Sequence, residues 1–210
     1  DPEAEGVVSM DFTSPLGAHA QIEPNGALAE VKDGKATIIM STQVVGLTQN
    51  QVAEALGMPV ENVNIIPTYL GGGFGRRLDT RHAIEAAQLS QAVGKPVKYF
   101  FTRKEEFQHD LFRPPTHHIM RGKLNADGQL EGLEHHYASG DVVINLPLFP
   151  DVMNKAMGTD LGAMRGANIQ YDKVPSHRAV QWHTTLPFAT SSWRSLGLLA
   201  NTFAIESFVD

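Results

Sequence analysis

Apolar runs separated by polar turn residues predict two β-hairpins in this chain. In GALAEVKDGKATIIM, two strand-like runs flank the sequence Lys32-Asp33-Gly34-Lys35. Because Asp-Gly favours the tight turn of a hairpin, we predict one from about Ala27 to Met40. A longer hairpin is predicted over residues 117–141, turning at Ala126-Asp127-Gly128.

A different spacing, with apolar residues three or four positions apart, predicts helices. In TQNQVAEALGMP, the residues Val52, Ala55 and Leu56 fall on one helical face. This helix is expected to end at Gly57, because glycine readily adopts the left-handed conformation that closes a helix, and Pro59 follows shortly after.

Two more helices are predicted further along the chain. RHAIEAAQLSQAVG, residues 81–94, follows Asp79 or Thr80 as its cap and stops at Gly94. LLANTFAIESFVD, residues 198–210, has roughly helical apolar spacing and is predicted as a terminal helix.

The remaining segments complete an alternation of strand and helix. Further strands are predicted in VNIIPTYL (63–70), VKYFFTR (97–103) and HRAVQWHTT (177–185), and the first, being β-branched and apolar, is expected to be buried. KEEFQHD is predicted as a helical turn, with Glu105 and Glu106 on a solvated face. Residues 141–172 are predicted as loop apart from a short helix in LPLFPDVMNKAMG.

This order of elements predicts an α+β fold, with a mixed sheet, hairpins and packed helices. We interpret residues 1–17 as a polar lead and residues 18–210 as the folded part, either one domain or two tightly joined lobes. An apolar content of 42% suits an ordinary core.

Charge and composition exclude several classes of function. Lys and Arg number 17 against 23 Asp and Glu, a net charge of −6, which gives no general attraction to nucleic acid or an anionic bilayer. No apolar run approaches the roughly 20 residues of a membrane span. The absence of cysteine excludes disulfides, thiolate metal sites and protein-ligated iron–sulfur clusters from these residues.

The stretch YLGGGFGRRLDTRHA lies between a predicted strand and a predicted helix, where backbone amides can receive an anion. A dinucleotide-binding fingerprint would need glycine where the chain has Arg76, and the Gly-Lys-Ser/Thr of a phosphate loop does not occur. A plain tight turn stays an alternative. An aromatic residue between glycines, Phe74, favours a loop that is held in position.

Two other features carry candidate chemistry. The pairs His117-His118 and His135-His136 lie on opposite arms of the second hairpin, so two of them can be cross-strand neighbours. A metal site is one interpretation and surface or hydrogen-bonded histidines are the commoner one. Arg194, in the predicted loop sequence WRSLG, can present paired donors to an anionic or oxo group, or pair with a nearby acid.

Taken in order, STQ, GGGFG and WRSLG resemble the large, molybdenum-cofactor-binding subunit of the xanthine oxidase and aldehyde oxidase family. GGGFGRR, SSWRSLG and NTFAIESFVD look most like the branch containing the isoquinoline 1-oxidoreductase β subunit. The likeness runs from about Ala18 to the chain end. The resemblance implies that residues 18–210 are the first of the family's two molybdopterin-binding domains, and we expect a partial chain with a truncated N-terminus.

The resemblance implies cofactor-binding roles for Gln43, Gly72, Gly73, Phe74, Gly75, Arg76 and Arg194. Gln43 matches the glutamine that hydrogen-bonds an oxo ligand of molybdenum, and Phe74-Gly75 the pair whose backbone faces the metal and the pterin. Arg194 matches an arginine flanking the same metal. No direct metal ligand is expected from the protein, so the absence of cysteine is consistent with this family.

Two departures from the family pattern bear on the substrate. Leu78 stands where purine-oxidising relatives have an acid, and Arg76-Arg77 replaces Gly-Lys. An apolar side chain there suits an N-heteroaromatic compound or an aldehyde better than a purine, because a buried polar group facing an apolar wall would go unpaired.

The implied activity is oxidation of such a substrate with oxygen derived from water. The implied cofactor is molybdopterin, as its cytosine dinucleotide, with molybdenum. The resemblance also implies that electrons leave through iron–sulfur clusters of a small partner subunit, to a cytochrome or another acceptor. The family's catalytic glutamate is expected beyond Asp210, so this piece alone is expected to be inactive. A non-catalytic scaffold or assembly domain that keeps the fold is the alternative.

Overall fold

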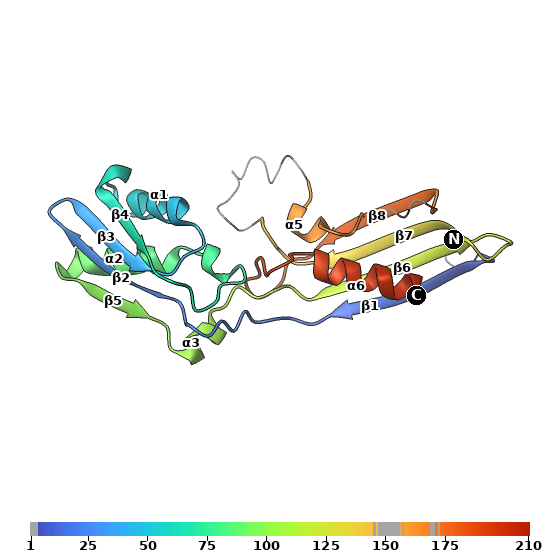
Figure 1. The fold of residues 1–210 in the computed structure, drawn as a ribbon, viewed down its shortest axis with the longest axis horizontal. Coiled ribbons are helices and arrows are strands. Elements are labelled where there is room, and N and C mark those ends of the chain that lie inside the picture. Colours follow the sequence, from blue (N-terminus) through green and yellow to red (C-terminus); the bar gives the residue numbers. More distant parts are fainter. Residues whose placement is uncertain (1–3, 145, 147–155, 157, 169–170, 172) are drawn as a thin grey trace. The chain divides into compact units, whose positions relative to one another are not determined.

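The computed structural model describes residues 4–144, 146, 156, 158–168, 171 and 173–210. It divides into two compact units, Ala18–Asp110 and Asp1–Gly17 with Leu111–Asp210 (Figure 1), which we call the 18–110 unit and the 111–210 unit. Each unit has its own sheet and helices, so the predicted α+β class is confirmed. Among the described residues, no helix has the length and apolar character needed to span a membrane.

The 18–110 unit is a four-stranded sheet with helices packed on one face. Its elements are β2 (Gly26–Lys32), β3 (Lys35–Met40), α1 (Val45–Leu56), η1 (Val60–Asn62), β4 (Val63–Pro67), η2 (Arg76–Leu78), α2 (Arg81–Val93), β5 (Val97–Phe100) and α3 (Arg103–Gln108). The strand order is β4-β3-β2-β5, with only β3 and β4 parallel among these pairs.

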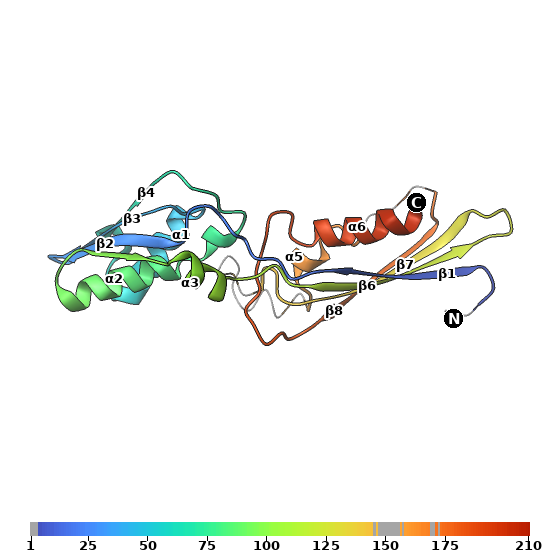
Figure 2. The ribbon, with the colours of Figure 1, turned by 90° about the horizontal axis from the view of Figure 1, so that it is seen from below.

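Small residues let α2 lie close to this sheet. Ala83, Ala86 and Ala87 are fully buried and belong to one core cluster with Ala27 and Ala29 of β2. A helix with alanine on its inner face can approach a sheet closely, and Figure 2 shows α2 running along the sheet. The hairpin of β2 and β3 confirms the prediction made from Asp-Gly.

Local signals placed the helix ends correctly. Gly57 and Gly94 close α1 and α2 in the left-handed conformation, with φ of 63° and 65°. At the start of α2, Thr80 is the cap residue, while the carboxylate of Asp79 accepts a hydrogen bond from the Arg81 backbone N–H at 3.1 Å.

Two predictions for this unit were wrong. β4 is an edge strand and only its core-facing side is buried: Val63 and Ile65 face the helices, whereas Ile66 lies on the opposite face of the sheet and is 42% exposed. Glu106 does not lie on a solvated face: it is 1% exposed. Glu105 is the solvated carboxylate of the pair, and it forms a reciprocal capping box with Thr102 at the start of α3.

The 111–210 unit is a second four-stranded sheet, in the order β1-β6-β7-β8. Its elements are β1 (Val7–Ser14), β6 (Thr116–Leu124), β7 (Leu130–Ser139), α5 (Leu161–Met164), β8 (Ser176–His183) and α6 (Leu198–Val209). The predicted second hairpin is confirmed as β6 and β7, and Figure 2 shows α6 along one face of the sheet. Ala204 and Ile205 of α6 are fully buried against Met120 and Leu133.

Two segments of this unit differ from the sequence prediction. Part of the polar lead is strand β1, which pairs antiparallel with β6 along its whole length. The segment predicted as loop contains the single turn α5, whose N-cap residue Asp160 accepts hydrogen bonds from two backbone amides of that turn with its carboxylate. Most of the short helix predicted in residues 146–158 lies outside the described residues.

Candidate functional site

The sequence Gly71–Gly75, which we call the glycine loop, follows β4 and leads through η2 into α2, as predicted. Phe74 has a φ of 57°, in the left-handed region that costs a bulky residue about 1–3 kcal/mol. Its ring is nonetheless 44% exposed. A strained backbone with an exposed aromatic ring is typical of a functional loop held in place by its surroundings.

Gln43 docks its side chain on this loop. Its Oε1 accepts hydrogen bonds from the backbone N–H groups of Gly75 at 3.1 Å and Arg77 at 3.3 Å. The Gln43 backbone N–H in turn donates to the Arg77 carbonyl at 3.1 Å. Two N–H donors converge on one side-chain atom, which must therefore be the oxygen.

The amide nitrogen of Gln43 is consequently the group presented outward. Gln43 is exposed, and no hydrogen-bond partner of its Nε2 occurs in the described part of the chain. Nε2 carries two N–H donors, so the docked side chain can offer them to an acceptor placed over the glycine loop. The structure thus brings together the predicted residues Gln43, Gly72, Gly73, Phe74 and Gly75.

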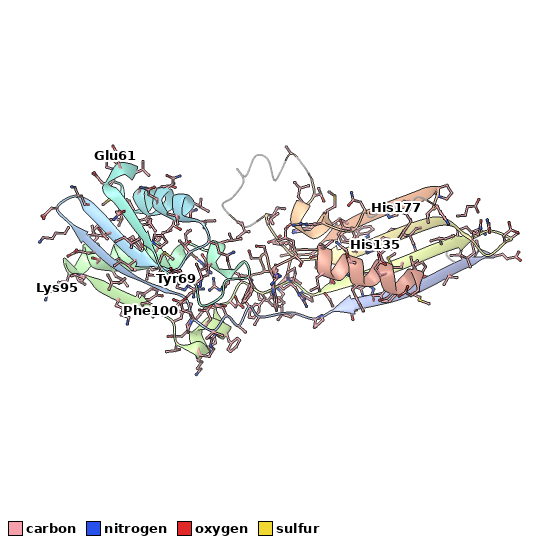
Figure 3. All side chains as sticks on the ribbon, viewed as in Figure 1. Glu61, Tyr69, Lys95, Phe100, His135 and His177 are labelled. Carbon is pink, nitrogen blue, oxygen red and sulfur yellow. The ribbon has the colours of Figure 1, made fainter. Side chains whose placement is uncertain are left out.

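Neighbouring side chains leave no room for a Cβ atom at two glycines of this loop. A Cβ on Gly73 would lie 2.6 Å from Gln43 Oε1, and one on Gly71 would lie 2.4 Å from Glu23 Cβ. Tyr69, just before the loop, is fully exposed (Figure 3). Glycine at positions 71 and 73 is therefore required by packing, because a side chain at either position would collide with Glu23 or Gln43.

Replacing Gly71 by alanine is expected to destabilise the 18–110 unit by about 1–3 kcal/mol, because the new methyl group overlaps Glu23. Urea unfolding followed by circular dichroism measures the effect. Gly46→Ala in α1 is the matched control, since nothing lies within 4 Å of a Cβ there, and it should be neutral or slightly stabilising. Equal stability of the two variants would show that the loop does not pack as described.

Arg76 lies behind the loop with its side chain committed to the interior. Its Nε is 3.1 Å from a Glu106 oxygen and 2.9 Å from an Asp110 oxygen, and its Nη1 is 2.8 Å from an Asp79 oxygen. Nη2 donates to the carbonyl of His109. Each guanidinium nitrogen of Arg76 thus has a partner within the protein, so none is left for the predicted contact with the cofactor. The side chain instead anchors the end of the loop.

Two of the carboxylates around Arg76, those of Asp79 and Asp110, are held ionised. Burial by itself would raise the pKa of Asp79, but hydrogen bonds and charge from Arg81 and Arg76 outweigh it and bring the pKa to about 2. Burial likewise opposes ionisation of Asp110, and the hydrogen bond and charge of His19 with the charge of Arg76 lower its pKa. The anchor is therefore an ion cluster, which sequence reasoning missed because Glu106 and Asp110 lie some 30 residues from Arg76.

Leu78, the predicted substrate-pocket residue, follows directly in η2 and is partly buried. Its backbone N–H donates to the Gly75 carbonyl at 3.1 Å, so its position is tied to the glycine loop.

Arg194 belongs to the other unit, in the loop between β8 and α6, where it is exposed. Within the described residues it forms no ion pair, so the interpretation as an arginine paired with an acid gains no support. Ser195 and Leu196 follow it with φ of 79° and 57°. Trp193 precedes it, with the Arg113 guanidinium 5.1 Å from the centre of its ring. This loop is thus also strained and held by packing, as the glycine loop is.

The histidine pairs place two rings together inside the 111–210 unit. His118 Nδ1 lies 2.9 Å from His135 Nε2, and His118 Nε2 lies 2.7 Å from the Thr116 hydroxyl. Both histidines are buried, which is the main reason that the pKa of each falls to about 4. Over the described residues, no group of three or more His, Cys, Asp or Glu is placed to hold a metal ion.

Comparison with known proteins gives a consistent picture. Residues 2–210 match the family model described as a molybdopterin cofactor-binding domain. The molybdenum-binding subunit PaoC of the aldehyde oxidoreductase of Escherichia coli strain K12 is 28% identical over 204 residues, 97% of this chain and 26% of PaoC. The β subunit of isoquinoline 1-oxidoreductase from Brevundimonas diminuta is 29% identical over 206 residues, 97% of this chain and 26% of that subunit.

A solved structure shows the same fold. Quinoline 2-oxidoreductase from Pseudomonas putida 86 superposes with a TM-score of 0.81 at 21% identity, over 99% of this chain and 26% of the other. The chain therefore spans about a quarter of the length of the proteins that it matches.

Proposed function

We propose a function from the premise that this chain belongs to the molybdopterin cofactor-binding domain family. The proposed function is that of a molybdenum-dependent oxidoreductase, which oxidises an aldehyde or an N-heteroaromatic compound with oxygen from water. Relatives described as an aldehyde oxidoreductase and an isoquinoline oxidoreductase support both substrate classes. The observation that carries the proposal is the orientation of the Gln43 side chain. Its oxygen accepts hydrogen bonds from the backbone of Gly75 and Arg77, which leaves its amide nitrogen as the donor that faces away from the loop.

The residues present fit a molybdopterin cofactor. A metal centre that brings its own ligands needs hydrogen-bond donors and close backbone approach from the protein, not carboxylate or imidazole ligands. Gln43 supplies donors, and Gly71 and Gly73 leave the loop without side chains where a Cβ would collide with a neighbour. Arg194 adds an exposed guanidinium on its own loop.

Within this proposal each residue has a defined task. Gln43 Nε2 would donate a hydrogen bond to an acceptor on the cofactor, and the backbone of Phe74-Gly75 would lie against it. Leu78 would form an apolar wall of the substrate pocket, which favours an aldehyde or heteroaromatic ring over a purine. When bound, the cofactor would supply the two-electron oxidation of the substrate carbon.

The proposal extends to the form of the cofactor and to partners. We assign the cytosine dinucleotide form of molybdopterin, an iron–sulfur partner subunit and a cytochrome or other final electron acceptor. The general base is assigned to no residue of this chain. Residues 18–210 act together as the cofactor-binding domain in this proposal.

Removal of the Gln43 donor is expected to lower kcat of the assembled enzyme by about 10²-fold, the usual effect of losing one preorganised donor. The measurement compares Gln43→Ala with wild type for aldehyde and N-heteroaromatic oxidation, with molybdenum and pterin content determined in both. Gln88→Ala, an exposed glutamine on α2, is the control and should leave kcat unchanged.

Unchanged kcat in Gln43→Ala would refute the role of the amide. Wild-type protein that lacks molybdenum and pterin, and turns over neither substrate class, would instead support the scaffold alternative.

A further inference from the structure

We infer that Arg77 and Glu23 are a pair of positioning residues that fix the glycine loop against Gln43. The inference rests on the proposed function and adds two residues to the site. Neither side chain is expected to touch the cofactor. Their part is to set the spacing between the Gln43 amide and the backbone of residues 72–75.

The guanidinium of Arg77 joins three separate chain segments. Its Nε donates to the Gly72 carbonyl at 3.0 Å, and its Nη1 donates to the Ser41 carbonyl at 3.3 Å. Its Nη2 donates to the carbonyl of Glu23 at 2.7 Å. The side chain is 1% exposed. One rigid plane of donors therefore connects the glycine loop, the segment two residues before Gln43, and the segment at residue 23.

Glu23 repeats the connection with its carboxylate. Its Oε2 accepts from the Gly71 backbone N–H at 2.8 Å and from the Ser41 hydroxyl at 3.0 Å. The same oxygen lies 3.0 Å from Arg77 Nη2, and the Glu23 backbone N–H donates to the Gly71 carbonyl. Both members of the pair therefore hold the same two segments, Ser41 and the start of the loop.

The Arg77 backbone completes the connection to Gln43. Its N–H donates to Gln43 Oε1 and its carbonyl accepts from the Gln43 N–H. Any shift of the Arg77 side chain is thus transmitted to both ends of the Gln43 residue. A displacement of about 1 Å at a positioned group can cost as much as 10²-fold in rate, so this spacing is worth fixing.

Lysine cannot replace Arg77 in this role. The Gly72 and Ser41 carbonyls are bound by different nitrogens of one fork, whereas a lysine ammonium is a single point that cannot occupy both positions. Arg77→Lys keeps the charge and most of the side-chain length, so it tests the fork and not the charge. Glu23→Gln is the milder second variant, because the Glu23 side chain is 33% exposed.

The first experiment is hydrogen–deuterium exchange of the peptide covering residues 71–78, in the full assembled protein. Arg77→Lys is expected to speed exchange of the loop amides by about tenfold, the effect of losing one ordinary hydrogen bond, while peptides from α2 stay protected. Arg178→Lys, an exposed arginine on β8, is the matched control and should leave this peptide unchanged. If Arg77→Lys fails to fold, Glu23→Gln decides by the same measurement.

The second readout is steady-state kinetics of the same variants. We expect kcat to fall by about tenfold or more with little change in KM or molybdenum content, and to fall no further when Arg77→Lys is combined with Gln43→Ala. The inference would be overturned, and the proposed function left standing, if both variants kept the wild-type exchange rate and the wild-type kcat. The same holds if the losses of kcat in Arg77→Lys and Gln43→Ala were fully additive. Absence of molybdenum from active wild-type enzyme would overturn the proposed function together with it.

Discussion

Glu106→Gln is expected to lower the free energy of unfolding by about 3–5 kcal/mol, because it breaks a buried ion pair with Arg76. The Glu106 carboxylate also accepts from Gln21 Nε2 at 2.8 Å and from the Asn25 backbone N–H at 2.7 Å. A glutamine amide would turn an NH₂ group toward one of these donors, so a hydrogen bond would be replaced by a repulsive contact.

The neighbouring residue provides a matched control for this change. Glu105→Gln makes the same substitution on a partly exposed side chain, and glutamine can keep the capping box with Thr102. We expect it to change stability by no more than about 0.5 kcal/mol. Urea unfolding of both variants by circular dichroism decides the point, and similar small effects for the two would mean that Glu106 is not the buried anchor described.

Acidification is expected to destabilise the 111–210 unit through His118 and His135. Each has a folded-state pKa of about 4, below the ordinary value of 6.5, because burial disfavours the charged ring. Above pH 6.5 both histidines are neutral in the folded state and in the unfolded state, so no stability is lost there. As the pH falls from 6.5 toward 4, only the unfolded state takes up protons, and about 3 kcal/mol of stability is lost per histidine.

This pH dependence is tested by urea unfolding between pH 7 and pH 4.5. The double variant His118→Gln/His135→Gln should be less stable at pH 7 but should lose clearly less stability than wild type across the same range. His117→Gln, on the exposed neighbour, should keep the wild-type profile. An unaltered profile in the double variant would show that these histidines do not titrate as described. Figure 3 places His135 on β7, beside the strand that carries His177.

The parts of the fold that the sequence predicts are those encoded by local chemistry. Asp33-Gly34 marks the first hairpin, and Gly57 and Gly94 mark helix ends, because each needs a backbone conformation that few residues adopt. Strand β1 was missed because it is mostly exposed and depends on pairing with β6, more than 100 residues away. Only the tertiary structure supplies that pairing.

The adjacent residues Glu105 and Glu106 show the same limit in the site. Glu105 caps the start of its own helix, α3. Glu106 accepts hydrogen bonds from Gln21, Asn25 and Arg76, which belong to distant segments. No local pattern distinguishes the two.

The candidate site itself was predicted from resemblance, and the geometry adds the physical reason. The order of Gln43 and the glycine loop in the sequence says that they belong together, whereas the hydrogen bonds to Oε1 explain how the amide is oriented. The contribution of Arg77 could not be predicted, because most of its partners are backbone carbonyls, which carry no sequence signal, and Glu23 lies 54 residues away. Arg76 and Arg77 are adjacent and alike, yet Arg76 pairs with three carboxylates, whereas Arg77 binds several backbone carbonyls and one carboxylate.

The most direct test of the central claim is an anomalous difference map of crystals of the assembled enzyme, recorded at the molybdenum absorption edge. The account predicts one strong peak facing Gln43 Nε2 and the backbone of Phe74-Gly75, with the Gln43 oxygen still bound to the loop amides. A peak remote from these groups, or no peak in crystals of active enzyme, would contradict it.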